Sequence, residues 1–126
     1  MQLWLQDKLP FTTVSIAYEG SAIDIPNVLI DTGSASTIMA ADIVAAIQIV
    51  PLPQDTLRVI RGVGGSEAVF IRRVDYLQVG DRSLPDFEVE VGGMDYGFEI
   101  NGILGMDFLL QAGAIINLRD MRIGFA

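Results

Sequence analysis

The feature that most constrains the fold of this chain is its division into short apolar segments separated by Gly, Pro and Asp. Residues 13–18 and 86–91 alternate apolar with polar or small side chains, the period of two that is typical of strands with one buried face. In the second segment we expect Phe and Val to face the core and the acids Asp86, Glu88 and Glu90 to face solvent. The pattern therefore predicts a mainly β protein.

Two segments depart from this pattern towards helix. Apolar residues recur at a spacing of four in residues 40–48, and residues 103–112 are apolar enough for a brief strand followed by a second short helix. Two hairpins are expected, in residues 57–72 around a glycine-rich tip and in residues 114–126. No linker or repeat divides the chain, and its length of 126 residues fits one domain spanning residues 1–126.

Two residue types, His and Cys, are absent from the sequence. Their absence excludes Ser-His-Asp and Cys-His catalytic pairs, an imidazole proton shuttle, the usual zinc ligand sets and any disulfide framework. If the chain is an enzyme, carboxylates are the leading candidates for its acid–base chemistry.

The charge balance is strongly acidic, with 16 acidic and 8 basic residues and a formal net charge of −8. This balance argues against nucleic acid or an anionic membrane surface as a partner. No apolar run approaches the roughly 18 residues of a membrane-spanning helix, so we expect no membrane insertion by this segment. The N-terminus lacks the basic start and apolar stretch of a signal peptide. We therefore expect a cytoplasmic protein, or one whose targeting segment has been removed.

A metal site would have to be built from oxygen ligands, and the acids considered for it are Asp95, Glu99, Asp107 and Asp120. Their spacing does not match the alternating ligands, glycine and terminal Glu of an EF-hand loop. The sequence therefore predicts no metal and no other cofactor.

The strongest candidate for chemistry is the tetrapeptide formed by Asp31, Thr32, Gly33 and Ser34, which directly follows the apolar run 28–30. That run predicts a strand buried on both faces, so the carboxylate emerges from apolar surroundings at a tight turn. The neighbouring hydroxyls and turn amides can orient the carboxylate. The alternative interpretation is an ordinary Asx turn, since Asp-Thr-Gly is also good turn chemistry.

Three motifs in this order resemble the retropepsin-like aspartic proteases: the Asp-Thr-Gly-Ser turn, the glycine-rich hairpin tip about 30 residues later, and an apolar-apolar-Gly triplet about 40 residues beyond. The resemblance covers most of the chain, from about Val14 to Ala112, and is closer to bacterial members than to the viral enzymes. It implies a closed acid-protease barrel with one lobe per chain and two short helices.

The resemblance also implies roles for particular residues. Asp31 corresponds to the catalytic aspartate, and Thr32, Gly33 and Ser34 shape and support its loop. The substrate-binding flap falls on Gly62, Val63, Gly64 and Gly65. The triplet that packs under the catalytic loop falls on Ile103, Leu104 and Gly105.

The sequence departs from the viral pattern at two places. Viral members continue Asp-Thr-Gly with Ala and Asp, whereas this chain continues with Ser34, Ala35 and Ser36. The contacts that the viral acidic residue makes to the substrate backbone therefore do not carry over to this chain. In the family an Arg commonly follows the glycine of the apolar-apolar-Gly triplet. Here Met106 follows Gly105, so the ion pair that this Arg makes at the subunit junction is missing. Asp107 could be a second catalytic acid, but we favour a structural role, because negative charge is favourable in the first turn of a helix.

The copy number of the motif bears on assembly. Aspartic proteolysis uses two facing carboxylates that share a proton, and this chain has one Asp-Thr-Gly. We therefore expect a homodimeric aspartic endopeptidase that binds polypeptide in an extended conformation. The alternative is a catalytically silent peptide-binding or dimerisation module. The C-terminal hairpin, with Met121, Ile123 and Phe125 on one side, and the N-terminal segment 3–5 could be interface strands or could pack in the core.

Overall fold

The structure is a computed structural model that describes residues 1–62, 65–94 and 99–126. It is mainly β, with 56% of residues in strands and two short α-helices, and this confirms the predicted fold class. The strands are β1 (Trp4–Gln6), β2 (Leu9–Tyr18), β3 (Ser21–Ile30), β4 (Ile38–Ala40), β5 (Leu57–Gly62), β6 (Gly65–Val79), β7 (Arg82–Gly92), β8 (Gly102–Leu104), β9 (Ala114–Asn117) and β10 (Arg122–Phe125). The helices are α1 (Ala41–Val44), which continues into a 3-10 turn at Ala45–Ile47, and α2 (Met106–Ala112).

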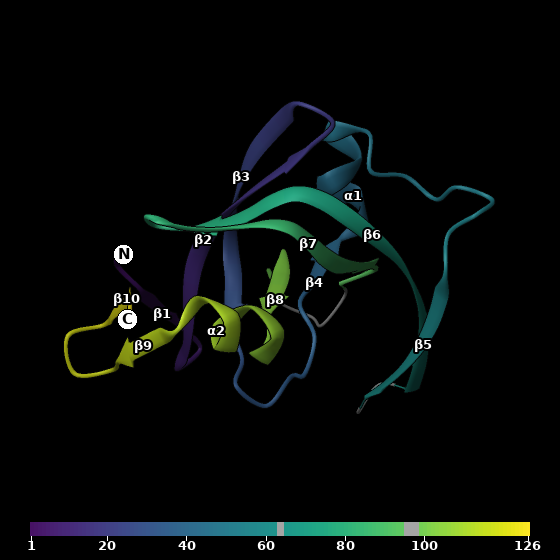
Figure 1. The fold of residues 1–126 in the computed structure, drawn as a ribbon. Helices are drawn as coiled ribbons and strands as arrows, with labels where there is room; N and C mark the ends of the chain where they lie inside the picture. The colour runs from purple at the N-terminus through teal and green to yellow at the C-terminus, as the bar shows by residue number, and fades with distance from the viewer. Residues whose placement is uncertain (63–64, 95–98) are drawn as a thin grey trace.

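Eight strands form one sheet in the order β1-β2-β3-β8-β4-β7-β6-β5, and β2 also pairs with β6. The additional pairing curls the sheet into a ring-like partial barrel (Figure 1). The remaining two strands, β9 and β10, form the predicted C-terminal hairpin. Strand β8 pairs in parallel with β3, and β7 pairs in parallel with β4, although each pair is far apart in the sequence. The end of β8 thereby lies beside the turn that follows β3.

The core contains the apolar faces of β2, β3, β6 and β7 together with one face of α2. Phe108 of α2 is fully buried and meets Phe87 of β7 edge to face, with ring centroids 5.8 Å apart. Aromatic pairs in this geometry contribute beyond the apolar area that they bury. Helix α2 ends at Gly113, which adopts the left-handed conformation with φ of 67° that glycine takes up without steric cost.

One expectation for β7 is wrong. Its apolar residues face inward as predicted and Asp86 and Glu88 are exposed, but Glu90 is only 5% exposed. Glu90 lies in the middle of the sheet, next to Thr37 of the β3–β4 connection and opposite Ile71 of β6. Its carboxylate pairs with Arg58 at 3.0 Å. Alternation within one strand could not reveal that both faces of β7 are covered at this residue.

The N-terminal segment pairs with the C-terminal hairpin of the same chain. The amide of Leu3 donates to the Met121 carbonyl at 2.8 Å, and the amide of Ile123 donates to the Met1 carbonyl at 3.0 Å. Leu3 and Ile123 are buried in the core, whereas Leu5 is 61% exposed. For Leu3 and Ile123, core packing is therefore the observed arrangement. Among the residues that the structure describes, no helix has the length and apolar character needed to cross a bilayer.

Candidate active site

Asp31 is the first residue after β3, and its position is fixed by the neighbouring parallel strand. Ile30 lies opposite Leu104 of β8, and the amide of Asp31 continues the ladder by donating to the Leu104 carbonyl at 3.1 Å. The Ile103-Leu104 run therefore lies directly beside the Asp-Thr-Gly turn, although more than 70 residues separate the two in the sequence.

The Asp31 carboxyl group is oriented by its own turn. The amide of Gly33 donates to Asp31 Oδ1 at 2.9 Å, and the amide of Ser34 donates to the Asp31 carbonyl at 3.2 Å. This is the geometry of an Asx turn, so the turn by itself fits both sequence interpretations. The second carboxylate oxygen accepts no hydrogen bond from the residues described, and it is available to a ligand. Thr32 and Gly33 are exposed in the single chain.

Gly105 allows α2 to pack directly under this loop. A Cβ atom built on Gly105 would lie 2.4 Å from the Ser36 carbonyl oxygen, closer than real side chains approach, and 3.0 Å from the Ser34 carbonyl oxygen. The next two amides bind the same loop: Met106 donates to the Ser34 carbonyl at 2.8 Å and Asp107 donates to the Ala35 carbonyl at 3.1 Å. The glycine is therefore required by close backbone approach.

Asp107 links the helix to the same loop through Thr37. Its Oδ2 accepts the Thr37 amide at 3.1 Å, and its Oδ1 accepts the Thr37 hydroxyl at 2.7 Å and the Phe108 amide at 2.7 Å. The buried Thr37 hydroxyl in turn accepts the Gly105 amide at 3.0 Å. Both carboxylate oxygens are thus engaged in holding the loop, which fits the structural role expected for Asp107. Thr37 could not be found from the sequence, because no local pattern connects it with a residue 70 positions away.

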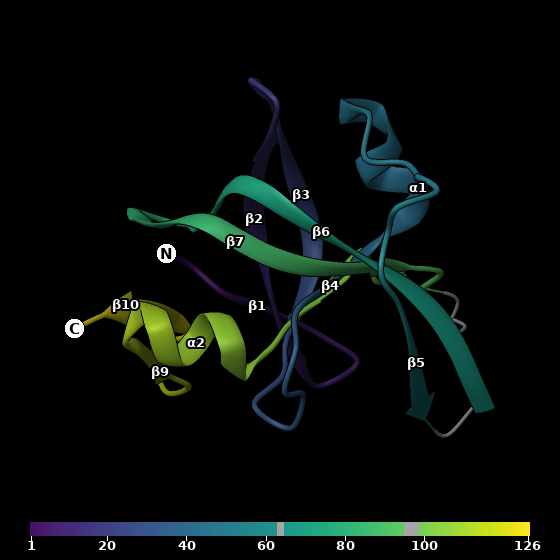
Figure 2. The same ribbon diagram turned by 45° about the vertical axis from the view of Figure 1, so that its right-hand side comes forward.

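The segment predicted to be the flap lies partly outside the described residues. Strands β5 and β6 form the predicted hairpin, with Gly62 opposite Gly65, and Val63 and Gly64 lie outside the description. The paired ends of β5 and β6 and the β3–β4 turn lie on the same side of the molecule, the lower side of Figure 2. The structure therefore places the base of the glycine-rich hairpin and the Asp31 loop at one face.

A buried ion pair that sequence reasoning missed anchors the segment leading into β5. Arg72 of β6 donates to both carboxylate oxygens of Asp55, at 2.9 and 2.8 Å, and to the Val50 carbonyl at 2.9 Å. Burial raises the pKa of the Asp55 carboxyl, but the hydrogen bond from the Leu52 amide and the pairing with Arg72 outweigh burial and hold that pKa below its ordinary value. The guanidinium also lies 5.4 Å from the centre of the Tyr18 ring.

The four acids considered for a cation do not form a described site. Asp95 lies outside the described residues, and the side chains of Glu99 and Asp120 bind Asn27 and Asn117 respectively. Within residues 1–62, 65–94 and 99–126, no group of three or more acidic residues is close enough to hold a metal ion.

Comparison with known families decides the relationship. A sequence model of the aspartyl protease family matches residues 14–108, well over half of the chain. The chain belongs to the retropepsin-like aspartyl protease family. The matched region includes the Asp31 turn, the glycine-rich hairpin and the Ile103–Gly105 triplet. No match was found among curated proteins. The retropepsin-like aspartyl protease resemblance of the three motifs is thereby confirmed.

Proposed function

We propose that this chain is one half of a homodimeric aspartic endopeptidase in which Asp31 of each subunit supplies one catalytic carboxylate. The observation that carries the proposal is the hydrogen bonding of the Asp31 carboxyl group. One oxygen is held by the Gly33 amide, while the other accepts no hydrogen bond from the described part of the chain. The loop that carries it is held from below by β8 and α2. Membership of the aspartyl protease family supports the same conclusion.

The assembly follows from the copy number of the motif. Two carboxylates about 3 Å apart cannot both ionise, so they share one proton, and one of them can act as a base while the other acts as an acid. The chain has one Asp-Thr-Gly, and a second copy related by a two-fold axis supplies the other in an isologous arrangement. Each chain, residues 1–126, then forms a single protease domain.

The edge of the C-terminal hairpin supports a second copy as partner. Strand β10 pairs with β9 on one side and with the N-terminal segment on the other, whereas β9 has no second neighbouring strand among the residues described. Ile115 of β9 and Leu118 of the following turn are 58% and 64% exposed. An unpaired strand edge with apolar side chains is a template for pairing with another chain. We therefore propose β9, rather than the buried residues Leu3 and Ile123, as the interface.

The chemistry requires only the two carboxylates and water. The ionised Asp31 accepts a proton from a water molecule, which attacks the scissile carbonyl carbon. The protonated Asp31 of the other subunit donates its proton to the carbonyl oxygen and stabilises the tetrahedral intermediate. Proton transfer to the leaving nitrogen then completes cleavage of the C–N bond.

The peptide lies extended between the catalytic loop and the flap. Its backbone pairs with Gly33 and with the base of the flap at Gly62 and Gly65, in the manner of an added strand.

The test is the Asp31→Asn variant, compared with Asp42→Asn as a matched control on an exposed residue of α1. Cleavage of a peptide library, read by mass spectrometry, should fall by about 10²–10⁴-fold in Asp31→Asn and remain unchanged in Asp42→Asn. The particle should sediment as a dimer under the assay conditions. Cleavage that survives Asp31→Asn would refute the mechanism. A wild-type chain that binds peptides without cleaving them would instead be a silent binding module.

A further inference from the structure

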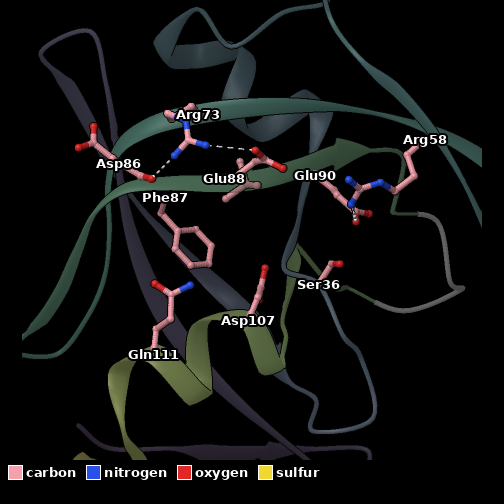
Figure 3. Close-up of a pocket in the computed structure, with 10 residues that line it drawn as sticks. Ser36, Arg58, Arg73, Asp86, Phe87, Glu88, Glu90, Asp107 and Gln111 are labelled. Carbon is pink, nitrogen blue, oxygen red and sulfur yellow. Dashed lines mark hydrogen bonds and ion pairs between the residues drawn. The ribbon is translucent and has the colours of Figure 1, made fainter.

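A cavity of about 410 Å³ lies between β7 and α2, beside the catalytic loop. Figure 3 shows Glu88 and Glu90 of β7 on one side of it, Gln111 and Asp107 of α2 on the other, and Ser36 of the catalytic loop at its edge. This volume is within the range of sites that hold small ligands or single groups of a larger one. The proposed function leaves this cavity without a role.

The charges that line the cavity favour a cation. Four carboxylates line it, and the two cationic residues, Arg58 and Arg73, leave a surplus of two negative charges. Both guanidinium groups already have partners: Arg58 binds Glu90 at 3.0 Å, and Arg73 binds the Asp86 carbonyl at 2.6 Å and Glu88 at 3.4 Å. An anion in the cavity would find both arginines already paired and would be repelled by the surplus negative charge.

Glu90 provides the most specific acceptor in the cavity. Its side chain is 7% exposed, and only Oε1 is bound, by Arg58. Within the described part of the chain Oε2 accepts no hydrogen bond. A buried carboxylate is stabilised when both oxygens accept hydrogen bonds from charged donors. Oε2 is therefore the acceptor that a second cationic donor in the cavity would bind.

The position of the cavity connects it with the proposed peptide groove. Ser36 lies five residues after Asp31 on the catalytic loop, and Arg58 lies on β5, the outer arm of the flap hairpin. A peptide that lies extended between the loop and the flap has its backbone between these two elements. Because Ser36 and Arg58 both line the cavity, a long side chain leaving that backbone beside Ser36 would point towards it.

We propose that this cavity is a specificity pocket that accepts a basic side chain, Lys or Arg, of the peptide substrate, with Glu90 and Glu88 as its acceptors. The inference rests on the proposed function, because it places the substrate backbone between the catalytic loop and the flap. It adds a substrate class, namely peptides with a basic residue near the scissile bond.

The test is a capture experiment that does not depend on cleavage. A randomised peptide library is captured on the dimeric Asp31→Asn variant, and the bound peptides are sequenced. Lys and Arg should be enriched about tenfold over Ala at one position, and the enrichment should decrease as salt is raised. The same library is captured on Asp31→Asn combined with Glu90→Gln, with Glu88→Gln or with Arg58→Gln.

The comparison of Glu90→Gln with Arg58→Gln separates a role in specificity from a structural role. Glu90→Gln and Arg58→Gln both break the same ion pair, so a purely structural role predicts the same change in both. A specificity pocket predicts opposite changes: Glu90→Gln removes the basic enrichment, whereas Arg58→Gln keeps or raises it, because the internal competitor for Glu90 is gone.

Several outcomes would overturn the pocket. They are enrichment of acidic residues, no charge preference at any position, and basic enrichment that survives Glu90→Gln and Glu88→Gln together. Failure of the wild-type chain to cleave peptides, with basic enrichment intact in Asp31→Asn, would overturn the protease proposal and leave the pocket standing.

Discussion

The packing of α2 against the Asp31 loop makes Gly105→Ala the sharpest test of how this candidate site is built. The added Cβ would lie 2.4 Å from the Ser36 carbonyl oxygen and 2.6 Å from its carbonyl carbon. Backbone atoms cannot rotate away as a side chain would, so loop and helix must separate by roughly 1 Å to restore ordinary contact.

The cost can be worked out from the contacts that such a separation breaks. Overpacking of a well-packed site costs about 1–3 kcal/mol. The amides of Gly105 and Met106 bind the Thr37 hydroxyl at 3.0 Å and the Ser34 carbonyl at 2.8 Å, and each such bond contributes about 1 kcal/mol. We expect Gly105→Ala to lower the free energy of unfolding by about 3–5 kcal/mol. The melting temperature should fall by at least about 10 °C.

The assay is urea unfolding followed by circular dichroism, with calorimetry as a second probe. Gly124→Ala is the matched control, because a Cβ at Gly124 would meet no atom within 4 Å; it should stay within about 0.5 kcal/mol of the wild type. Equal stability of Gly105→Ala and Gly124→Ala would show that the close approach under the Asp31 loop is not what requires glycine here.

Two further predictions concern anchoring residues. The lowered pKa of Asp55 means that its contribution to stability is fully present above its ordinary value of 3.8 and is lost as the pH falls below that value towards the lower folded pKa. Asp55→Asn should therefore be less stable at neutral pH and show a flatter loss of stability on acidification, measured by urea midpoints at several pH values; a parallel curve would contradict the pairing with Arg72. Asp107→Ala should lose about 2–3 kcal/mol, because it removes charge-assisted hydrogen bonds to Thr37 and a helix amide. Asp120→Ala, at an exposed turn, serves as control in the same unfolding assay, and equal loss in both would rule out this role for Asp107.

Much of the fold follows from local pattern. Period-two alternation, glycine-rich turns and two short helical stretches were enough to predict the mainly β class, both hairpins and both helices. These features depend on near neighbours in the chain, because the strand period and the turn conformations are set by residues a few positions apart. The order of three motifs was enough to identify the family, which the family match confirms.

The interactions that hold the candidate site together were less accessible from the sequence. Thr37 and Asp107 are 70 residues apart, and Arg58 and Glu90 are 32 apart. Glu90 was predicted to face solvent because alternate positions of one strand cannot report what covers the opposite face of the sheet. Its carboxylate pairs with Arg58 of β5, a contact that depends on how β5, β6 and β7 are ordered in the sheet.

The sequence by itself narrowed the candidate chemistry: the absence of His and Cys leaves carboxylates, and the resemblance of three motifs to aspartic proteases singles out Asp31 among them. Only the tertiary structure decided what surrounds Asp31. The parallel pairing of β3 with β8 and the close approach of Gly105 bring the second motif under the first. The physical reason is that residue chemistry is local, whereas burial and charge pairing depend on which distant strands the barrel brings together.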